Sequence, residues 1–199
     1  EFCEEEIRPI AQEIEDEHRF PDEAFADLND LDMMGVPVSE EYGGLGGDQL
    51  MYALVTEEIG RVSGGIGLSY AAHTSLGAKP IELFGTPEQK EEWLRPLAEG
   101  GEIGAWALTE PGSGSDASDM DTTADFDPDA GEYVLNGTKQ FITNANVANS
   151  VLVKAVTDPD AGYDGISTFI VDPDDDGFEI TTVWDKMGLN SSPTCEIKL

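Results

Sequence analysis

The sequence is poor in basic side chains. It has 10 Lys and Arg against 42 Asp and Glu, which gives a formal net charge of −32. A field of that sign repels the phosphates of nucleic acids and anionic lipids, so we expect neither nucleic acid nor a membrane surface as a partner. The acids are dispersed along the chain, which predicts a solvated acidic face on every element and indicates a halophilic source.

Cysteine and histidine are also scarce, with two of each. Cys3 and Cys195 lie at opposite ends without a CxxC neighbour, which favours a reducing cytoplasm over a disulfide framework. His73 has no partner at ligand spacing, so we expect a core side chain and no metal site. No apolar run approaches the ~20 residues that span a bilayer, and Glu1–Glu6 resembles no targeting peptide. We therefore expect a soluble, cytoplasmic protein.

The first half of the chain carries helical signals. Apolar residues recur at helical spacing up to about residue 100, and the segment Ile66–Leu76 is apolar or small on nearly all faces, which predicts a buried helix. Gly35 stands where a helix C-cap is expected and Asp48 where an N-cap is expected. Thr86–Gln89 has the pattern of a capping box and opens a helix expected to reach Ala98. We predict an all-α domain over residues 1–102.

The second half changes to alternating patterns with many turn signals. Asn136-Gly137 between strand residues predicts a hairpin. Six or seven short strands at this spacing indicate an antiparallel barrel or sandwich over residues 103–199, and so an α+β chain of two domains. The candidate strands are Ala105–Leu108, Tyr133–Leu135, Val151–Val156, Ile166–Val171, Phe178–Trp184 and Thr194–Leu199.

Two motifs resemble known ligand loops but lack the necessary context. Gly112–Ala117 fits the G-x-G-x-x-A dinucleotide fingerprint, yet hairpins follow it where a helix and a parallel strand are required. Asp172–Gly177 resembles the first half of an EF-hand loop, but Val183 stands where the bidentate glutamate belongs. We reject both interpretations.

The segment Trp106–Asp116 remains, in which a short strand runs into Thr-Glu-Pro and then into glycines and serines. Glycine lets the backbone approach a ligand and present successive N–H groups, which suits an anion such as a pyrophosphate. Serine hydroxyls add neutral donors in a chain with few cations. An ordinary Gly-Ser loop at a barrel edge is the alternative on chemistry alone.

Four motifs resemble those of the acyl-CoA dehydrogenase family, over essentially all 199 residues. Trp106–Asp116 matches an aromatic-x-x-Thr-Glu-Pro-x-x-Gly-Ser-Asp segment, and Lys139–Ala145 matches Lys-x-(Trp/Phe)-Ile-Thr-Asn-(Gly/Ala). Glu41–Gly47 and Asp185–Glu196 resemble two further blocks. Two positions depart from the family pattern: Phe141 stands where several members have tryptophan, and Asn190 replaces a usual arginine.

The resemblance implies FAD as cofactor. Residues in the first motif would line the flavin ring, Gly114 and Ser115 would face the pyrophosphate and the substrate thioester, and the second motif would contact the other flavin edge. Ser69 and Tyr70 would lie at the acyl pocket with Ser115, in the manner of short- and branched-chain members. The implied cofactor contacts are Trp106, Ala107, Leu108, Thr109, Gly114, Ser115, Phe141, Ile142 and Thr143.

The resemblance further implies α,β-dehydrogenation of an acyl-CoA, with electrons passed to an electron-transfer flavoprotein, in a homotetramer or homodimer. The catalytic base would come from a C-terminal helical domain beyond Leu199, so we expect no catalytic residue in this chain. Glu110 is the one tempting base within it, but the family motif makes it part of a turn. An acyl-CoA oxidase, a related flavin monooxygenase and a non-catalytic FAD- or acyl-CoA-binding module are the alternatives.

The charge of the chain predicts that folding requires concentrated salt. Self-repulsion at −32 opposes the compact state, and salt shortens its reach from ~10 Å at 0.1 M to ~3 Å at 1 M. Circular dichroism during dialysis from molar KCl into dilute buffer should report unfolding. A spectrum unchanged by dilution would contradict the halophilic interpretation.

Overall fold

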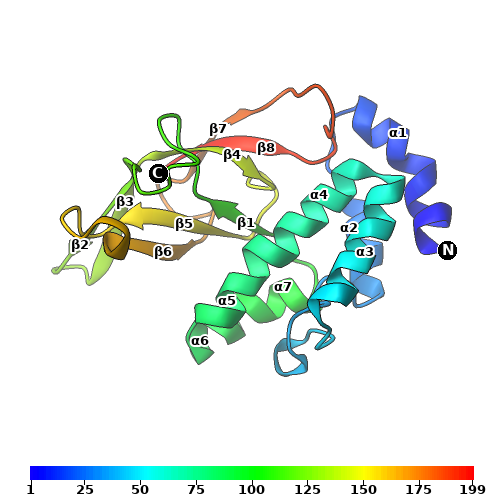
Figure 1. The fold of residues 1–199 in the computed structure, drawn as a ribbon, viewed down its shortest axis with the longest axis horizontal. Coiled ribbons are helices and arrows are strands. Elements are labelled where there is room, and N and C mark those ends of the chain that lie inside the picture. The colour runs from blue at the N-terminus through cyan, green and yellow to red at the C-terminus, as the bar shows by residue number, and fades with distance from the viewer.

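The computed structural model describes all 199 residues. Helices occupy the first half of the chain and strands the second (Figure 1). The N-terminus lies at the helical end of the molecule and the C-terminus in the β part. None of the helices combines the length and the apolar character needed to cross a membrane. The predicted order, a helical region followed by a β region, is confirmed.

Seven α-helices are joined in part by π-helical turns, so that α4 and α5 form one continuous helix, as do α6 and α7. The π-helical turns cover Cys3–Ile7, His73–Ala78 and Lys90–Leu94, and a 3-10 turn covers Glu40–Tyr42. The α-helices are α1 (Arg8–Asp16), α2 (Asp22–Asp30), α3 (Gln49–Val62), α4 (Gly64–Ala72), α5 (Lys79–Phe84), α6 (Pro87–Gln89) and α7 (Arg95–Glu99).

Both predicted helix starts are confirmed. The Asp48 carboxylate accepts from the Met51 N–H at 2.9 Å and begins α3. At α6 the Gln89 N–H donates to Thr86 Oγ1 at 3.3 Å, and the Thr86 N–H donates to Gln89 Oε1 at 2.9 Å, which completes the capping box. Local side-chain acceptors therefore fix both starts.

The predicted C-cap at Gly35 is wrong. Helix α2 ends at Asp30, and the left-handed residue after it is Asp32, with φ of 58°. Gly35 has another role, because a Cβ there would lie 2.6 Å from the Ala98 carbonyl oxygen. The glycine is required by close packing against α7 rather than by a helix end.

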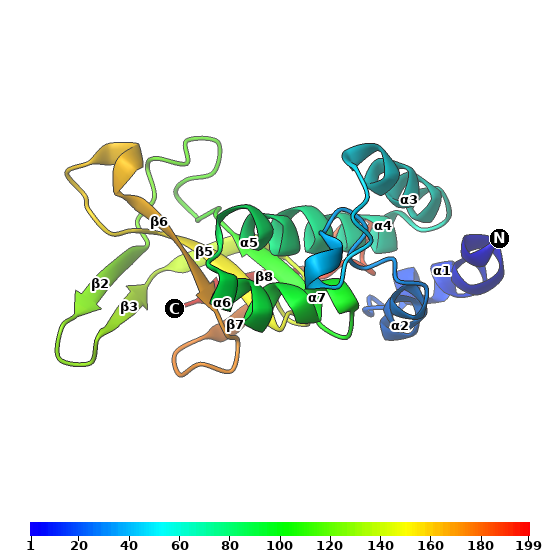
Figure 2. The same ribbon diagram turned by 90° about the horizontal axis from the view of Figure 1, so that it is seen from below.

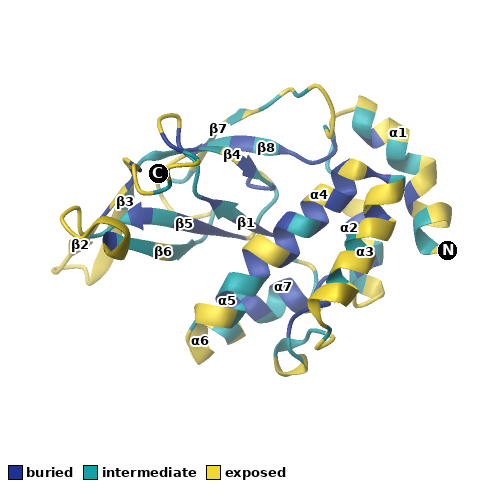
Figure 3. Cartoon of the chain, in the orientation of Figure 1, coloured by how far each residue is buried: buried dark blue, intermediate teal, exposed yellow.

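The expected buried helix is present as α4 and the π-helical turn after it. Tyr70 and His73 are completely buried, whereas Leu68 and Leu76 point outward, with 39% and 44% of their surface exposed. Figure 3 shows the contrast with α3, most of which is exposed. Helix α4 thus lies between α3 and the strands.

Eight strands form two sheets. The first has the order β1-β5-β2-β3, with β6 also paired to β5, and the second has the order β4-β8-β7. In Figure 2 the β2–β3 hairpin projects from the end of the molecule away from the helices. The strands are β1 (Gly104–Ala107), β2 (Thr123–Asp127), β3 (Glu132–Asn136), β4 (Thr138–Thr143), β5 (Ser150–Val156), β6 (Ile166–Val171), β7 (Glu179–Val183) and β8 (Thr194–Lys198). A 3-10 turn over Gly162–Gly165 precedes β6.

The β part is not purely antiparallel. Pairs β2–β3, β4–β8, β5–β6 and β7–β8 are antiparallel as expected, but β1 pairs with β5 in parallel, as does the single pairing of β2 with β5. More than forty residues separate β1 from β5, and a connection of that length lets the chain return in the same direction.

The predicted hairpin at Asn136-Gly137 is wrong. Strand β3 pairs with β2 through the turn after Asp127, and the chain then passes at Gly137 into the other sheet. A Cβ at Gly137 would lie 2.2 Å from Thr122 Oγ1. Close packing explains this glycine, and β2 and β4 are strands that the alternation analysis did not list.

An apolar seam joins the helices to the first sheet. It consists of Val38, Ala78, Ile81, Leu94, Leu97, Ala98 and Leu152, with Trp106 and Ile170 packed against it. Gly77 and Gly104 meet beside this seam, and a Cβ on Gly77 would lie 2.7 Å from the Gly104 backbone. The strand and the helix approach this closely because neither glycine has a side chain.

We predict that Gly77→Ala destabilises the fold by roughly 1–3 kcal/mol, because the added methyl group displaces β1. Gly60→Ala is the control: its Cβ would meet nothing within 4 Å, so the helix preference of alanine should stabilise α3 by about 0.5–1 kcal/mol. Denaturant unfolding of both variants in molar salt measures the difference. Equal stabilities would contradict the close-approach argument.

Candidate cofactor site

The two most specific sequence motifs meet in space. The residues after β1 run alongside β4, and the Gln140 N–H donates to the Thr109 carbonyl at 2.7 Å. Leu108, Thr109 and Thr143 are half-buried, so these segments keep part of their surface accessible. Residues about thirty positions apart in sequence therefore form one surface.

The Gly-Ser loop beside this surface has room for a ligand. A Cβ on Gly114 would meet only Thr109 Cγ2, at an ordinary 3.5 Å, and neither Gly112 nor Gly114 has a left-handed φ. The fold of the described chain thus gives no steric reason for these glycines, unlike the one at Gly137. A group bound against the loop backbone supplies such a reason.

Strained backbone surrounds Thr143. Phe141 and Asn144 have φ of 61° and 67°, a region that costs energy for residues with side chains. A register shift between Lys139 and Ile142 turns Phe141 outward, so that 57% of it is exposed and its ring lies 5.6 Å from the Trp184 ring centroid. Strain of this kind clusters at functional sites.

Asn144 ties the end of β4 to helix α4. Its N–H donates to the Pro193 carbonyl at 3.0 Å, and its Nδ2 donates to the Ser69 carbonyl at 3.0 Å. The Ser69 hydroxyl donates to Ser192 Oγ at 2.9 Å. Asn144 Oδ1 is buried without a partner, an unused acceptor next to Thr143.

The predicted site residues do not all reach this surface with their side chains. Ala107 and Ile142 point into the β core, so only their backbone is available to a ligand. Ser115 is exposed on the loop, and Ser69 is fully buried in the contact with Ser192. Tyr70 is also buried: its ring belongs to the helical core and its hydroxyl donates to the Met33 carbonyl at 2.9 Å.

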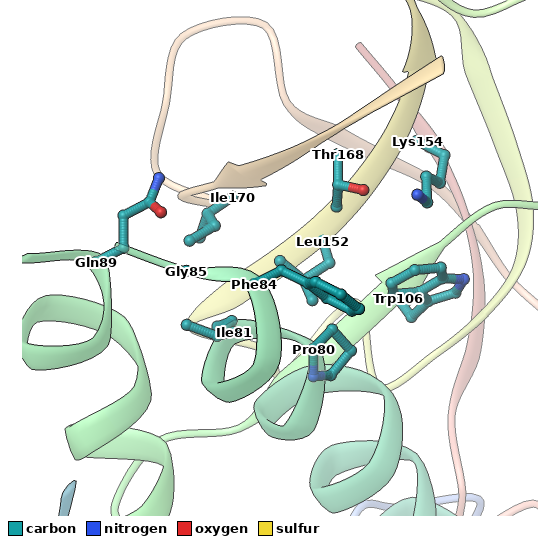
Figure 4. A pocket seen from close by; sticks show the side chains of 10 residues that line it. All are labelled: Pro80, Ile81, Phe84, Gly85, Gln89, Trp106, Leu152, Lys154, Thr168 and Ile170. Atoms are coloured by element: carbon teal, nitrogen blue, oxygen red, sulfur yellow. The ribbon is translucent and has the colours of Figure 1, made fainter. Parts of the chain in front are cut away.

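Trp106 faces the helices instead. Its ring lines a half-open cavity of about 360 Å³ between α5 and the strands (Figure 4). Phe84 and Leu152 form apolar parts of the wall, and Lys154 Nζ lies 5.5 Å from the centroid of the Trp106 ring. The alternation of β1 explains the difference, because Ala105 and Ala107 point to the opposite face.

His73 belongs to the core, as predicted. Its Nδ1 accepts from the Gly104 N–H at 3.1 Å, while Nε2 has no partner. Burial lowers the pKa of His73 to about 4, so the ring is neutral at pH 7. No group of three or more His, Cys, Asp or Glu side chains is arranged to hold a metal ion.

Glu110 forms a buried ion pair that the sequence analysis missed. Its carboxylate accepts from Lys139 Nζ at 2.7 Å, with both side chains almost fully buried. Burial alone would raise the pKa of Glu110, but hydrogen bonds from Lys139 and Thr122 lower it overall. No local signal marked Lys139 as inward, because β4 was not among the predicted strands and a register shift between Lys139 and Ile142 breaks its alternation. A carboxylate held in this way is a poor proton acceptor.

The Asp185–Glu196 motif is hydrogen-bonded to α1 through Glu15. Glu15 accepts from the Asn190 N–H at 2.9 Å and from the Ser191 N–H and hydroxyl at 3.1 Å each. The Asn190 side chain accepts from the Lys186 N–H at 3.2 Å. Asn190, the departure from the family pattern, therefore closes its own turn through its side chain and binds α1 through its backbone.

The fold and these motifs together describe a chain with a helical region, a β region and an uncrowded Gly-Ser loop between β1 and β2. Family models match both halves: "Acyl-CoA dehydrogenase, N-terminal domain" at residues 1–101 and "Acyl-CoA dehydrogenase, middle domain" at residues 105–199. The chain belongs to the acyl-CoA dehydrogenase family.

Three relatives illustrate the similarity. The short-chain specific acyl-CoA dehydrogenase of Clostridium acetobutylicum is 46% identical over 99% of this chain and 52% of its own length. A chain in a structure of the electron transferring flavoprotein of Acidaminococcus fermentans has a TM-score of 0.95 at 41% identity, covering 99% of this chain and 51% of that one. An acyl-CoA dehydrogenase of Bacillus anthracis complexed with FAD has a TM-score of 0.90 at 38% identity, covering 100% and 33%. The chain spans about half the length of the curated relatives it matches.

We predict that Glu15→Gln costs about 1 kcal/mol at neutral pH, because it removes a charged acceptor of three hydrogen bonds. Burial raises the pKa of Glu15, but the bonds from Asn190 and Ser191 lower it overall. The stabilisation is therefore present above the unfolded pKa of ~4.3 and is lost as pH falls through the lower folded value.

Unfolding in denaturant between pH 3 and 7 measures this difference between wild type and variant. Glu6→Gln removes an equal charge from an exposed position and corrects for general repulsion. A difference that does not shrink on acidification would contradict the assignment.

Proposed function

We propose that the protein containing this chain is an FAD-dependent enzyme that converts an acyl-CoA thioester into the trans-2-enoyl-CoA. The observation that carries the proposal is the hydrogen bond from Gln140 to Thr109, which sets the Phe141–Thr143 segment beside the uncrowded Gly112–Ser115 loop. The relatives' names support the cofactor and the substrate class.

The loop and the two motifs fit the parts of FAD. Gly114 and Ser115 are suited to the pyrophosphate, because an open backbone and a hydroxyl supply neutral donors where Lys139, the nearby cation, is already paired. Leu108, Thr109 and the exposed Phe141 offer apolar and aromatic surface for the flavin ring. The Thr143 hydroxyl, between two strained residues, is a candidate donor to its edge.

FAD, when bound, supplies the hydride acceptor for the β-hydrogen of the substrate. Removal of the α-proton needs a carboxylate within hydrogen-bond reach. Glu110 does not meet this requirement, because both of its oxygens are engaged and its pKa is lowered. We propose that the base comes from a helical domain beyond Leu199.

The relatives favour two of the remaining assignments. A short-chain enzyme among them favours a short or branched acyl group, and the similarity to a chain in the flavoprotein structure favours an electron-transfer flavoprotein as acceptor. We propose the division into residues 1–102 and 103–199, a homotetramer or homodimer, and a halophilic, cytoplasmic setting. Ser69 would shape the acyl pocket through its link to Asn144 and Ser192.

An acyl-CoA oxidase is the second candidate, because a prolyl acyl carrier protein oxidase also has this fold, at 32% identity and a TM-score of 0.92. Oxygen reactivity after reduction separates the two enzymes. A non-catalytic binding module would bind FAD or acyl-CoA without any reduction.

The test is anaerobic bleaching of flavin absorbance by acyl-CoAs of increasing chain length. We expect bleaching by the full-length protein, none by residues 1–199 reconstituted with FAD, and weaker flavin retention in full-length Thr109→Val/Ser115→Ala. Ser118→Ala, on the same loop but outside the motif, is the control. Unchanged retention in the double variant would contradict the site assignment, and bleaching by the 199-residue chain would place the base within it.

A further inference from the structure

The ion pair between Glu110 and Lys139 is the most deeply buried charged contact of the chain. Lys139 has no exposed side-chain surface and Glu110 has 3%, whereas the partners in the other ion pairs keep between 15% and 86%. Burying two charges costs several kcal/mol per ion unless every donor and acceptor is satisfied. This pair therefore needs a reason beyond ordinary packing.

The pair joins three separate segments. Glu110 Oε1 accepts from Lys139 Nζ and from the Thr122 N–H at 3.0 Å, and Oε2 accepts from the Asp121 N–H at 2.5 Å. Lys139 Nζ also donates to the Leu108 carbonyl at 3.2 Å. Glu110, Lys139 and the backbone groups that they bind form one polar node. This node joins the segment after β1, the segment before β2 and strand β4.

The node closes the Gly-Ser loop. The loop leaves the core at Glu110, whose N–H donates to the Ser113 carbonyl at 2.8 Å, and returns at Asp121 and Thr122. Between these points most residues are exposed or half-buried. The Glu110 carboxylate is the contact that holds both ends of the loop together.

The same node positions the loop beside β4. Lys139 begins the motif that continues to Phe141 and Thr143. Its ammonium group donates to the Leu108 carbonyl, and the next residue, Thr109, accepts from the Gln140 N–H. A buried, hydrogen-bonded ion pair fixes a geometry that apolar packing leaves adjustable. The distance between the loop and the Phe141–Thr143 segment depends on this pair.

We propose that Glu110 and Lys139 are positioning residues for the cofactor site: their ion pair holds the Gly112–Ser115 loop at the spacing from Phe141–Thr143 that a bound flavin dinucleotide needs. The inference rests on the proposed function. Neither side chain has a free face, so each acts through the segments that it holds.

Charge variants distinguish positioning from general destabilisation. Lys139→Met leaves the buried Glu110 carboxylate without a cation. In this variant the Gly112–Ser115 loop should open as pH rises and Glu110 ionises. Glu110→Gln leaves a buried ammonium alone, so that loop should open as pH falls. Glu110→Gln/Lys139→Met buries no charge and should show neither trend. Asp121, the carboxylate beside Gly112, is kept in every variant.

The experiment measures FAD dissociation from the full-length protein in molar KCl between pH 6 and 9. We expect each single variant to bind FAD at least tenfold more weakly at its unfavourable pH, with opposite pH trends, and the double variant to recover part of the loss without a trend. Lys139→Arg, which keeps the charge, should stay within about threefold of wild type and shows that the site tolerates substitution. Glu91→Gln, at the exposed pair with Arg95, is the control and should leave binding unchanged.

Single variants that bind FAD as tightly as wild type at every pH would overturn the inference. Equal, pH-independent losses in both singles and the double would overturn it as well, because they indicate a structural defect. If a single variant does not fold, the rate of protease cleavage within residues 111–120 is measured instead, in the FAD-free Lys139→Arg and Glu110→Gln/Lys139→Met proteins. Faster cleavage of the double variant supports the inference. Equal cleavage rates in the two proteins overturn it. FAD binding by the wild-type protein is measured first. If the wild-type protein binds no FAD, the proposed function itself is refuted, which is a separate result.

Discussion

The close approach of β1 to the long helix formed by α4 and α5 is the constraint on which the rest of the structure depends. Gly77 and Gly104 touch backbone to backbone, and the apolar seam beside them joins the two halves of the chain. If either residue had a side chain, β1 would move away from the helix. The Leu108–Ser115 segment follows β1 directly, so this contact also fixes where the candidate site begins.

Most of the few basic residues contact an acidic or aromatic side chain. Six of the ten form ion pairs with acids, and Lys90 and Lys154 lie over aromatic rings. Most of these pairs are exposed, where each contributes little on its own. Only Lys139 is buried in the interior, beside the loop that we assign to the pyrophosphate. An anion there would have to be held by neutral donors, and the glycines and serines of the loop supply them.

The candidate site combines rigid support with local strain. Asn144 is anchored to Ser69 and Pro193, yet its backbone and that of Phe141 occupy the left-handed region. The surrounding contacts hold this geometry against its cost. Helix α4, Thr143 and the loop after β1 come from different parts of the chain, and tertiary packing alone brings them to one place.

The order of helices and strands, the helix starts at Asp48 and Thr86 and the family could be predicted from the sequence, because caps, periodicity and motifs depend on neighbouring residues. Tertiary structure decided what depends on distant partners. It made the β1–β5 pair parallel and gave Gly35 and Gly137 packing roles. It also buried Tyr70, turned Trp106 toward α5 and joined Glu110 to Lys139. A local pattern cannot encode these outcomes, since each is set by an atom 15 or more residues away in the sequence.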